Sequence, residues 1–161
     1  MTAWQPAYVA LGSNQREPED QLRRAFDALA TVRATRLVVR SRLWRTPPFG
    51  PVAQPDFINA VAGLLTQLSP HELLAELRAI ETAQGRVRGV RWGPRTLDLD
   101  LLVHGTARVD DAELTVPHPG IAERAFVLYP LAELAPALEV PGVGRVDVLA
   151  ARVDGQDIRA L

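Results

Sequence analysis

Two helix patterns alternate with four strand patterns along this chain, and their order constrains the fold more than any other feature. Residues 8–11, 36–45, 57–66 and 97–103 are apolar or alternating runs typical of strands. Apolar residues recur at helical spacing over about 18–31. They recur again in a second segment, which begins with a capping box at Ser69 and ends before Gly85. The order β-α-β-β-α-β predicts an α+β fold of the ferredoxin-like type, an antiparallel sheet with its helices on one face.

The rest of the chain predicts less. Residues after about 105 are expected to form an appendage of short elements, including 114–119 and 125–128. The segment after about residue 146 matches no clear pattern. Without a linker, repeat or low-complexity tract, residues 1–161 are expected to form a single domain.

Composition excludes several classes of function. The chain has 161 residues, a formal net charge of −1 and no cysteine, which excludes disulfides, thiolate catalysis and cysteine-based metal sites. All 18 basic residues are arginine, which excludes a P-loop lysine and Schiff-base chemistry. The near-neutral charge argues against general nucleic-acid binding. With no apolar stretch long enough for a bilayer and no signal-peptide pattern, we expect no membrane contact and a cytoplasmic location.

The most informative motif runs from Gly85 to Leu102, where an arginine-rich loop leads directly into two aspartates. Four arginines and no acid precede Asp98 and Asp100. Side chains two apart on a strand share a face, so the two carboxylates are expected side by side. Neighbouring carboxylates repel unless a cation lies between them, and Mg²⁺ is typically held by one or two carboxylates together with substrate phosphates. The motif predicts a phosphoryl-transfer site.

Each half of this motif has a plainer interpretation. Two aspartates on a strand can simply face water, and an arginine run is more often a solvated surface. Aspartate is depleted in strands, however, and the adjacency of the two features favours function.

A second group of candidates surrounds residues 46–59. The double proline after Thr46 forms a stiff loop, and Asn59 offers both a donor and an acceptor to the edge of a heterocycle. A rigid hairpin with a core Phe57 is the alternative. His118, between two prolines, could contact phosphate or be structural, and Trp92 could close over a flat ligand or anchor its loop.

These segments together resemble one known family, the 6-hydroxymethyl-7,8-dihydropterin pyrophosphokinases of folate synthesis. The resemblance covers about residues 7–136 in the family's order. Its strongest part is R-W-G-P-R-T-L-D-L-D-L-L at 91–102, and it also includes A-L-G-S-N at 10–14, R-T-P-P-F-G at 45–50, Q-P-D-F-I-N-A at 54–60, G-R-V-R at 85–88 and V-P-H-P at 116–119.

The resemblance implies transfer of pyrophosphate from ATP to the pterin hydroxymethyl group, with release of AMP. It implies two Mg²⁺ ions, held by Asp98 and Asp100, and a catalytic set of Arg86, Arg95, Asp98 and Asp100. The implied ATP-binding residues are Arg78, Glu81, Arg88, Arg95, Leu101, Thr115, His118 and Arg124. The implied pterin-binding residues are Thr46, Pro47, Phe49, Phe57, Asn59, Trp92 and Phe126. ATP and the pterin are the expected partners of a monomer.

Two other classes stay open from the residues alone. One is a ferredoxin-like nucleic-acid-binding module that uses the arginine loop on phosphates, although it lacks the paired-aromatic strand signature of an RNA-recognition sheet. The other is a catalytically idle domain that senses a small molecule. Mg²⁺-dependent nucleotide binding would distinguish the enzyme from both.

Overall fold

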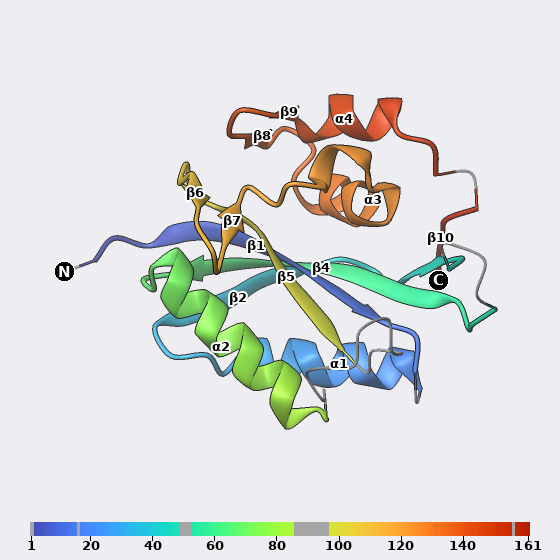
Figure 1. Cartoon of the computed structure of the whole chain (residues 1–161), viewed down its shortest axis with the longest axis horizontal. Helices are drawn as coiled ribbons and strands as arrows, with labels where there is room; N and C mark the ends of the chain where they lie inside the picture. The colour runs from blue at the N-terminus through green and yellow to red at the C-terminus, as the bar shows by residue number, and fades with distance from the viewer. Residues whose placement is uncertain (1, 16, 49–52, 86–96, 156) are drawn as a thin grey trace.

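The main structural element is a six-stranded antiparallel sheet. The computed structural model describes residues 2–15, 17–48, 53–85, 97–155 and 157–161 (Figure 1). The strands follow the order β10-β3-β4-β1-β5, and β2 also pairs with β4. Their bounds are β1 Gln5–Ser13, β2 Thr35–Arg40, β3 Trp44–Thr46, β4 Phe57–Thr66, β5 Asp98–His104 and β10 Arg159–Ala160.

This arrangement confirms the α+β, ferredoxin-like prediction. If β2 and β3 are counted as one strand, the core reads β-α-β-β-α-β, and β1 lies centrally between β4 and β5. The predicted strand over 57–66 is observed with the same bounds, and that over 97–103 begins one residue later.

The predicted strand over 36–45 is wrong in one respect, because it is two strands. The Ser41 N–H donates to the Val61 carbonyl at 2.9 Å, and the Val61 N–H donates to Ser41 Oγ at 2.9 Å. A side-chain oxygen thus accepts where a regular ladder would use a backbone carbonyl, and the strand is interrupted. Both pieces pair with β4, β3 near its beginning and β2 near its end.

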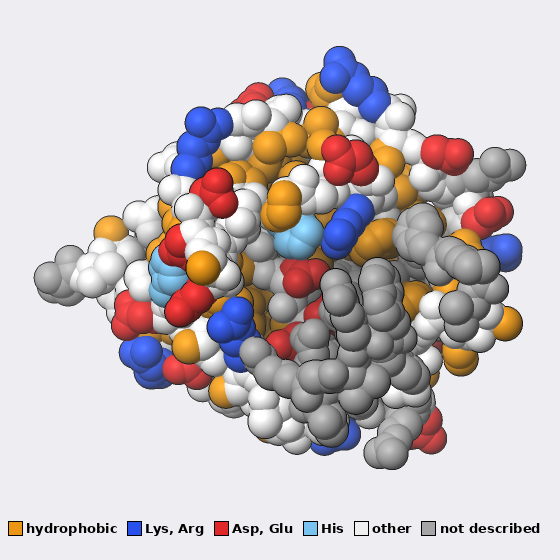
Figure 2. Space-filling view, in the orientation of Figure 1, with side chains coloured by type: hydrophobic (Ala, Val, Ile, Leu, Met, Phe, Trp, Pro, Cys, Tyr) orange, Lys and Arg blue, Asp and Glu red, His pale blue; other side chains and the backbone are white. Residues whose placement is uncertain are grey.

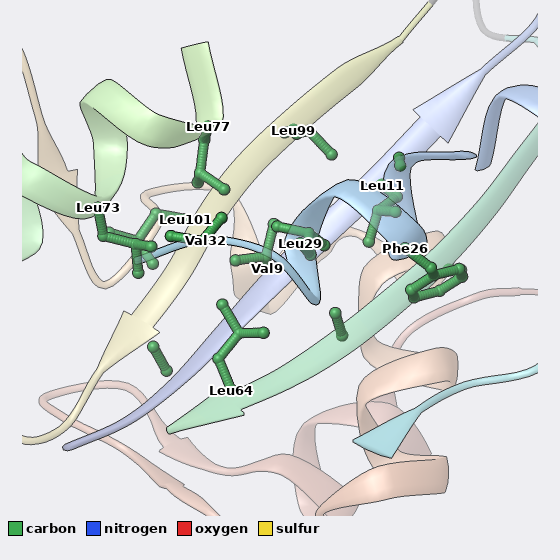
Figure 3. Packing of buried hydrophobic residues seen from close by; sticks show 14 of the residues in the cluster. Val9, Leu11, Phe26, Leu29, Val32, Leu64, Leu73, Leu77, Leu99 and Leu101 are labelled. Atoms are coloured by element: carbon green, nitrogen blue, oxygen red, sulfur yellow. The ribbon is translucent and has the colours of Figure 1, made fainter. Parts of the chain in front are cut away.

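Helices α1 (Pro18–Leu29) and α2 (Pro70–Ala83) cover one face of the sheet, as predicted (Figure 1). Their apolar sides pack on alternate residues of β1, β4 and β5, because successive strand side chains point to opposite faces. Figure 3 shows this core, which includes Val9, Leu11, Phe26, Leu29, Leu64, Leu73, Leu77, Leu99 and Leu101.

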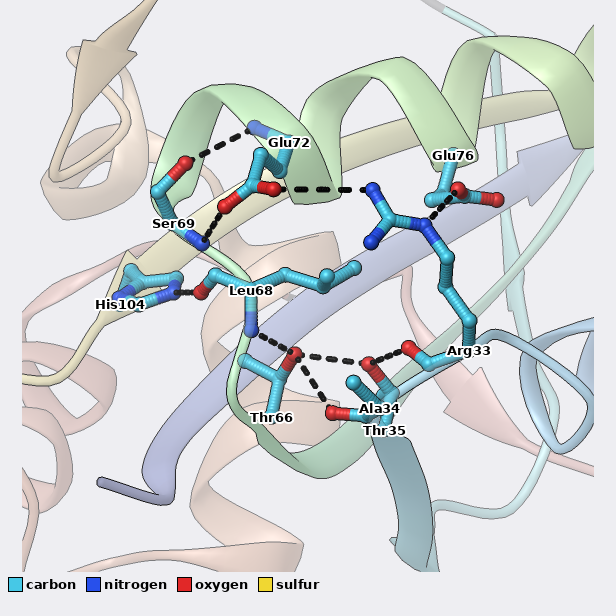
Figure 4. Close-up of polar contacts among 9 residues, drawn as sticks. All are labelled: Arg33, Ala34, Thr35, Thr66, Leu68, Ser69, Glu72, Glu76 and His104. Carbon is cyan, nitrogen blue, oxygen red and sulfur yellow. Dashed lines mark hydrogen bonds and ion pairs between the residues drawn. The ribbon is translucent and has the colours of Figure 1, made fainter. Parts of the chain in front are cut away.

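The beginning of α2 is fixed by the predicted capping box (Figure 4). The Glu72 N–H donates to Ser69 Oγ at 3.2 Å, and the Ser69 N–H donates to Glu72 Oε1 at 3.0 Å. These two bonds satisfy N–H groups that have no partner within the helix. Nearby, Thr66 Oγ1 accepts from the Leu68 N–H and lies 2.7 Å from Thr35 Oγ1, so β4 leads into α2 along a defined path.

The opposite face carries elements that the sequence analysis left short or unplaced. Helix α3 (Ala125–Leu134) packs on β4, and α4 (Val146–Arg152) packs on α3. A second core, which includes Val61, Leu102, Leu128 and Leu131, lies between α3 and the sheet. The smaller elements are β6 Val109–Asp110, β7 Thr115–Val116, η1 Ile121–Glu123, β8 Glu139–Val140 and β9 Gly144–Arg145. Among the described residues, no helix is both long and apolar enough to span a bilayer.

Candidate active site

The two aspartates of β5 share the face of the sheet that α3 also covers. Leu99, between them, points the other way into the core and is 4% exposed. The Asp100 side chain is 37% exposed, so its carboxylate reaches solvent. The alternation expected from the sequence is therefore confirmed.

Asp98 lies in line with Asn59 across the sheet. Asp98 pairs with Gly12 of β1, and Gly12 pairs on its other side with Asn59 of β4. Two strand spacings separate Asp98 from Asn59, about 10 Å between their backbones. Gly12 has no side chain to fill this interval: a Cβ there would lie 3.0 Å from Asn59 Oδ1.

A connection from β7 to α3 brings a histidine and an arginine to the aspartates. His118 Nε2 lies 4.0 Å from Asp100 Oδ2, and the His118 N–H donates to the Leu102 carbonyl of β5 at 2.9 Å. The Gly120 N–H donates to His118 Nδ1 at 3.1 Å, which leaves the proton of a neutral ring on Nε2, toward Asp100. Figure 2 shows a histidine side chain with basic and acidic side chains beside it near the middle of the visible surface.

The charge state of His118 follows from its surroundings. Burial lowers the pKa of its imidazole below the ordinary 6.5, and the nearby Arg124 guanidinium lowers this pKa further. The Asp98 carboxylate acts in the opposite direction, and the net effect is a lowered pKa. At neutral pH, His118 is therefore a neutral hydrogen-bond donor beside the carboxylates.

The predicted aromatic and amide groups lie on the same face. Asn59 is 6% exposed, and its Nδ2 donates to Thr46 Oγ1 at 2.9 Å, so its amide orientation is set by β3. Phe57 begins β4 and Phe126 lies in the first turn of α3, both partly buried. The Arg124 guanidinium lies 5.9 Å from the centre of the Phe126 ring. The amide of Asn59 and the carboxylates of Asp98 and Asp100 thus lie on one face of the sheet.

Other predicted residues lie around β5 at the outer edge of the sheet. Arg78 of α2 donates to the Glu113 carbonyl at 3.5 Å, and Thr115 belongs to β7. Glu81 is 3% exposed, and its Oε2 accepts the Leu99 N–H at 2.9 Å. Leu101 is 3% exposed within the core, so a contact with a ligand would come from its main chain.

Of the six remaining predicted residues, the structure describes one. Pro47 follows β3 and is exposed. Outside the described residues lie Phe49, Arg86, Arg88, Trp92 and Arg95.

The donor set at β5 fits Mg²⁺. Asp98 and Asp100 supply hard carboxylate oxygens from one face of one strand. In the part of the chain that the structure describes, no three acidic, histidine or cysteine groups gather as a metal site. A pair of carboxylates is what a magnesium ion shared with substrate phosphates requires, since phosphate oxygens and water complete its coordination.

Taken together, a ferredoxin-like sheet with paired strand carboxylates, a neutral histidine and an arginine has the groups that a metal-assisted phosphoryl-transfer protein needs. Comparison with known proteins identifies the kind. A family model described as 7,8-dihydro-6-hydroxymethylpterin-pyrophosphokinase (HPPK) matches residues 8–136. The chain belongs to this family.

Individual relatives agree with the family model. The 2-amino-4-hydroxy-6-hydroxymethyldihydropteridine pyrophosphokinase of Pseudomonas aeruginosa is 55% identical over 137 residues, covering 85% of each chain. The protein of the same name from Haemophilus influenzae is 48% identical over 135 residues, covering 84% of each chain. These names favour the enzyme over the nucleic-acid-binding and sensing alternatives.

Solved structures show the same fold. A Plasmodium falciparum HPPK-DHPS triple mutant superposes with a TM-score of 0.75 at 13% identity, covering 94% of this chain. A second variant of that protein gives a TM-score of 0.74 at 14% identity. This chain spans 43% and 46% of those longer chains, so the likeness concerns the fold of one part of them.

Two features of the site were missed by the sequence analysis. Asn14 is 2% exposed, and its Nδ2 donates to Gln54 Oε1 at 2.8 Å, which ties the end of β1 to the segment before β4. Both residues lie in motifs that resemble the family, and this is the only sign in the sequence that they belong near the site. The second feature, the bond between Glu81 and the β5 backbone, depends on how α2 packs and has no signature in the sequence.

Proposed function

We propose that this chain carries out the reaction its family name describes: it transfers pyrophosphate from ATP to the hydroxymethyl group of 6-hydroxymethyl-7,8-dihydropterin and releases AMP. The observation that carries this proposal is the row formed by Asp98, Gly12 and Asn59 across three adjacent strands. The Asp98 carboxylate, proposed to bind metal, stands at one end of this row and the oriented Asn59 amide at the other. A hydroxyl on a flat heterocycle at Asn59 would thereby be brought close to phosphates held at Asp98.

The metal end of the row consists of Asp98 and Asp100. We propose that they hold two Mg²⁺ ions together with the phosphates of ATP. When bound, Mg²⁺ neutralises phosphate charge and orients the reacting oxygens. The carboxylates themselves are kept in place by the β1 ladder and by burial of Leu99 between them.

The nucleotide would lie along β5, the outer edge strand of the sheet. His118 and Arg124 reach this position from one side, and Arg78, Glu81 and Thr115 flank it from the other, with the main chain of Leu101 between them. A neutral His118 donates to phosphate without adding charge, whereas Arg124 contributes a permanent one. Among residues outside the described ranges, Arg86, Arg88 and Arg95 are proposed as further phosphate ligands, Arg86 and Arg95 as catalytic groups.

The pterin would lie between the aromatic rings of Phe57 and Phe126. Asn59 presents both a donor and an acceptor, and its bond to Thr46 presets their directions before any ligand arrives. Thr46 and Pro47 border this site, as Phe49 and Trp92 are proposed to do. The expected monomeric state, single domain and cytoplasmic location stay predictions.

The direct test replaces each aspartate by asparagine and follows AMP formation. Asp98→Asn and Asp100→Asn keep the size of the side chain but remove charge, so we expect turnover to fall on the order of 10²–10³-fold or more. Asp27→Asn, on the exposed side of α1, is the matched control and keeps full activity. Formation of ADP in place of AMP, or near-normal turnover in either site variant, would refute the proposal.

A further inference from the structure

An acidic residue occupies the core-facing side of α2. Leu73, Leu77 and Glu81 recur every four residues, and all three are buried. Figure 3 shows Leu73 and Leu77 pointing from α2 toward the sheet. Residues four apart share a helix face, so Glu81 continues this stripe where another leucine would be expected.

This position is unfavourable for a carboxylate on two grounds. Glu81 lies in the last turn of α2, whose end carries the negative pole of the helix dipole. Its side chain is also almost fully buried, and a buried charge is costly unless it is hydrogen-bonded. A residue that breaks two local rules points to a role outside its own helix.

The Glu81 carboxylate bonds to the strand that carries the metal-binding aspartates. Its Oε2 accepts the Leu99 N–H at 2.9 Å. This N–H belongs to the peptide unit joining Asp98 to Leu99, directly between the two aspartates. On this side of β5 no strand of the described chain pairs with it, because β5 ends the sheet order. Glu81 therefore supplies, at one point, the acceptor that a neighbouring strand would otherwise provide.

We propose that Glu81 is a positioning residue for the metal site: by holding the Leu99 N–H, it fixes the peptide unit that joins Asp98 to Leu99, and with it the part of β5 that carries Asp98 and Asp100. This inference rests on the proposed function, because it assumes that the two aspartates bind Mg²⁺. β5 is then fixed on three sides, by the β1 ladder, by the buried Leu99 side chain and by Glu81. This role replaces the direct contact with the nucleotide that the family resemblance implies for Glu81, and that contact is the competing role.

Two substitutions separate these roles. Glu81→Met keeps the volume but has no oxygen acceptor for the Leu99 N–H. Glu81→Gln keeps an oxygen acceptor in the same place without the charge. Glu76→Met is the matched control, since Glu76 lies on the same helix, is partly exposed and bonds to Arg33 at 3.0 Å.

Three quantities are measured for each protein. The first is the hydrogen-exchange rate of the Leu99 amide, measured by NMR. The other two come from calorimetry with a non-hydrolysable ATP analogue: the Mg²⁺ concentration at which binding of the analogue is half-maximal, and the affinity of the analogue without Mg²⁺. For Glu81→Met we expect at least tenfold faster Leu99 exchange and at least a fivefold higher half-saturating Mg²⁺ concentration. The metal-free nucleotide affinity stays within twofold. Glu81→Gln and Glu76→Met stay within twofold of the parent protein in Mg²⁺ dependence.

Several results would overturn the inference. One is a Glu81→Met protein with fast Leu99 exchange but an unchanged Mg²⁺ dependence. Another is an equal loss of nucleotide affinity with and without Mg²⁺, which would assign Glu81 to the nucleotide itself. If Glu81→Met does not fold, Glu81→Gln decides, because a fivefold rise there contradicts a role based on geometry.

A parallel titration of Asp98→Asn separates this inference from the proposed function. Mg²⁺-dependent nucleotide binding that persists in Asp98→Asn would refute the proposed metal site. Loss of that binding in Asp98→Asn, with an unaffected Glu81→Met, would refute the role of Glu81 alone.

Discussion

Replacing Gly12 by alanine would separate the stability of this protein from its affinity for the pterin. Gly12 adopts no positive φ, so alanine fits the backbone, and alanine in place of a strand glycine is worth about 0.5–1 kcal/mol of added stability. The new methyl group, however, would lie 3.0 Å from Asn59 Oδ1, closer than nine in ten such contacts. Asn59 must therefore yield by a few tenths of an ångström.

The size of the effect follows from the contacts of Asn59. Its amide is held from the other side by Thr46 Oγ1 at 2.9 Å, so it cannot retreat without straining that bond. A weakened hydrogen bond to the ligand costs about 0.5–1.5 kcal/mol. With about 1.4 kcal/mol per factor of ten, the dissociation constant of the pterin should rise about 2- to 12-fold.

Calorimetric titration with the pterin, together with urea unfolding, measures both quantities. Gly63→Ala is the matched control: its methyl group would collide with Val39 Cγ2 at 2.7 Å on the same face of the sheet, away from Asn59. We expect this control to lose stability but to keep pterin affinity. A folded Gly12→Ala protein with unchanged pterin affinity would show that Asn59 and the space above Gly12 do not form the pterin site.

Two further predictions concern the cap of α2 and the titration of His118. Ser69→Ala removes the side-chain acceptor of the capping box, so the free energy of unfolding in urea should fall by about 1 kcal/mol. Turnover per folded molecule should stay unchanged. An unchanged free energy of unfolding would mean that the cap contributes nothing to stability. In the protein without Mg²⁺ and nucleotide, NMR titration should give a pKa for His118 below 6.5. Because the unfolded chain then binds the extra proton more readily, His118 should lower the free energy of unfolding as the pH falls below 6.5. The His118→Gln protein should lose this part of the pH dependence. A His118 pKa at or above 6.5 would contradict the burial argument.

Local signals were enough to predict the half of the fold that lies around α1 and α2. The spacing of Leu22, Phe26 and Leu29 and the capping box at Ser69 each depend on neighbours in the sequence, and the structure confirms both helices. Helix α4 and strand β10 could not be predicted, because α4 has only 7 residues and β10 has 2. Elements this short are stabilised by tertiary contacts, here of α4 with α3 and of β10 with β3, and the periodicity of the sequence does not reveal such contacts.

The same distinction applies to the candidate site. Strand alternation alone placed Asp98 and Asp100 on one face. The approach of His118 to Asp100 depends on the path of the chain between β7 and α3, and the bond from Glu81 to Leu99 depends on helix packing. For His118 and Glu81 the family resemblance implied a role in binding ATP, but it did not predict their contacts with Asp100 and Leu99.

The pairing of β10 with β3 has a consequence for where this protein could be shortened. The family match ends at residue 136, yet Arg159 and Ala160 pair with Arg45 and Trp44, directly before Thr46. A fragment cut at the limit of the match would keep every matched residue but lose the strand that braces β3 from outside. Strand β3, whose Thr46 orients Asn59, would then be an open edge of the sheet, so the structural support of this site extends beyond the residues that the family model matches.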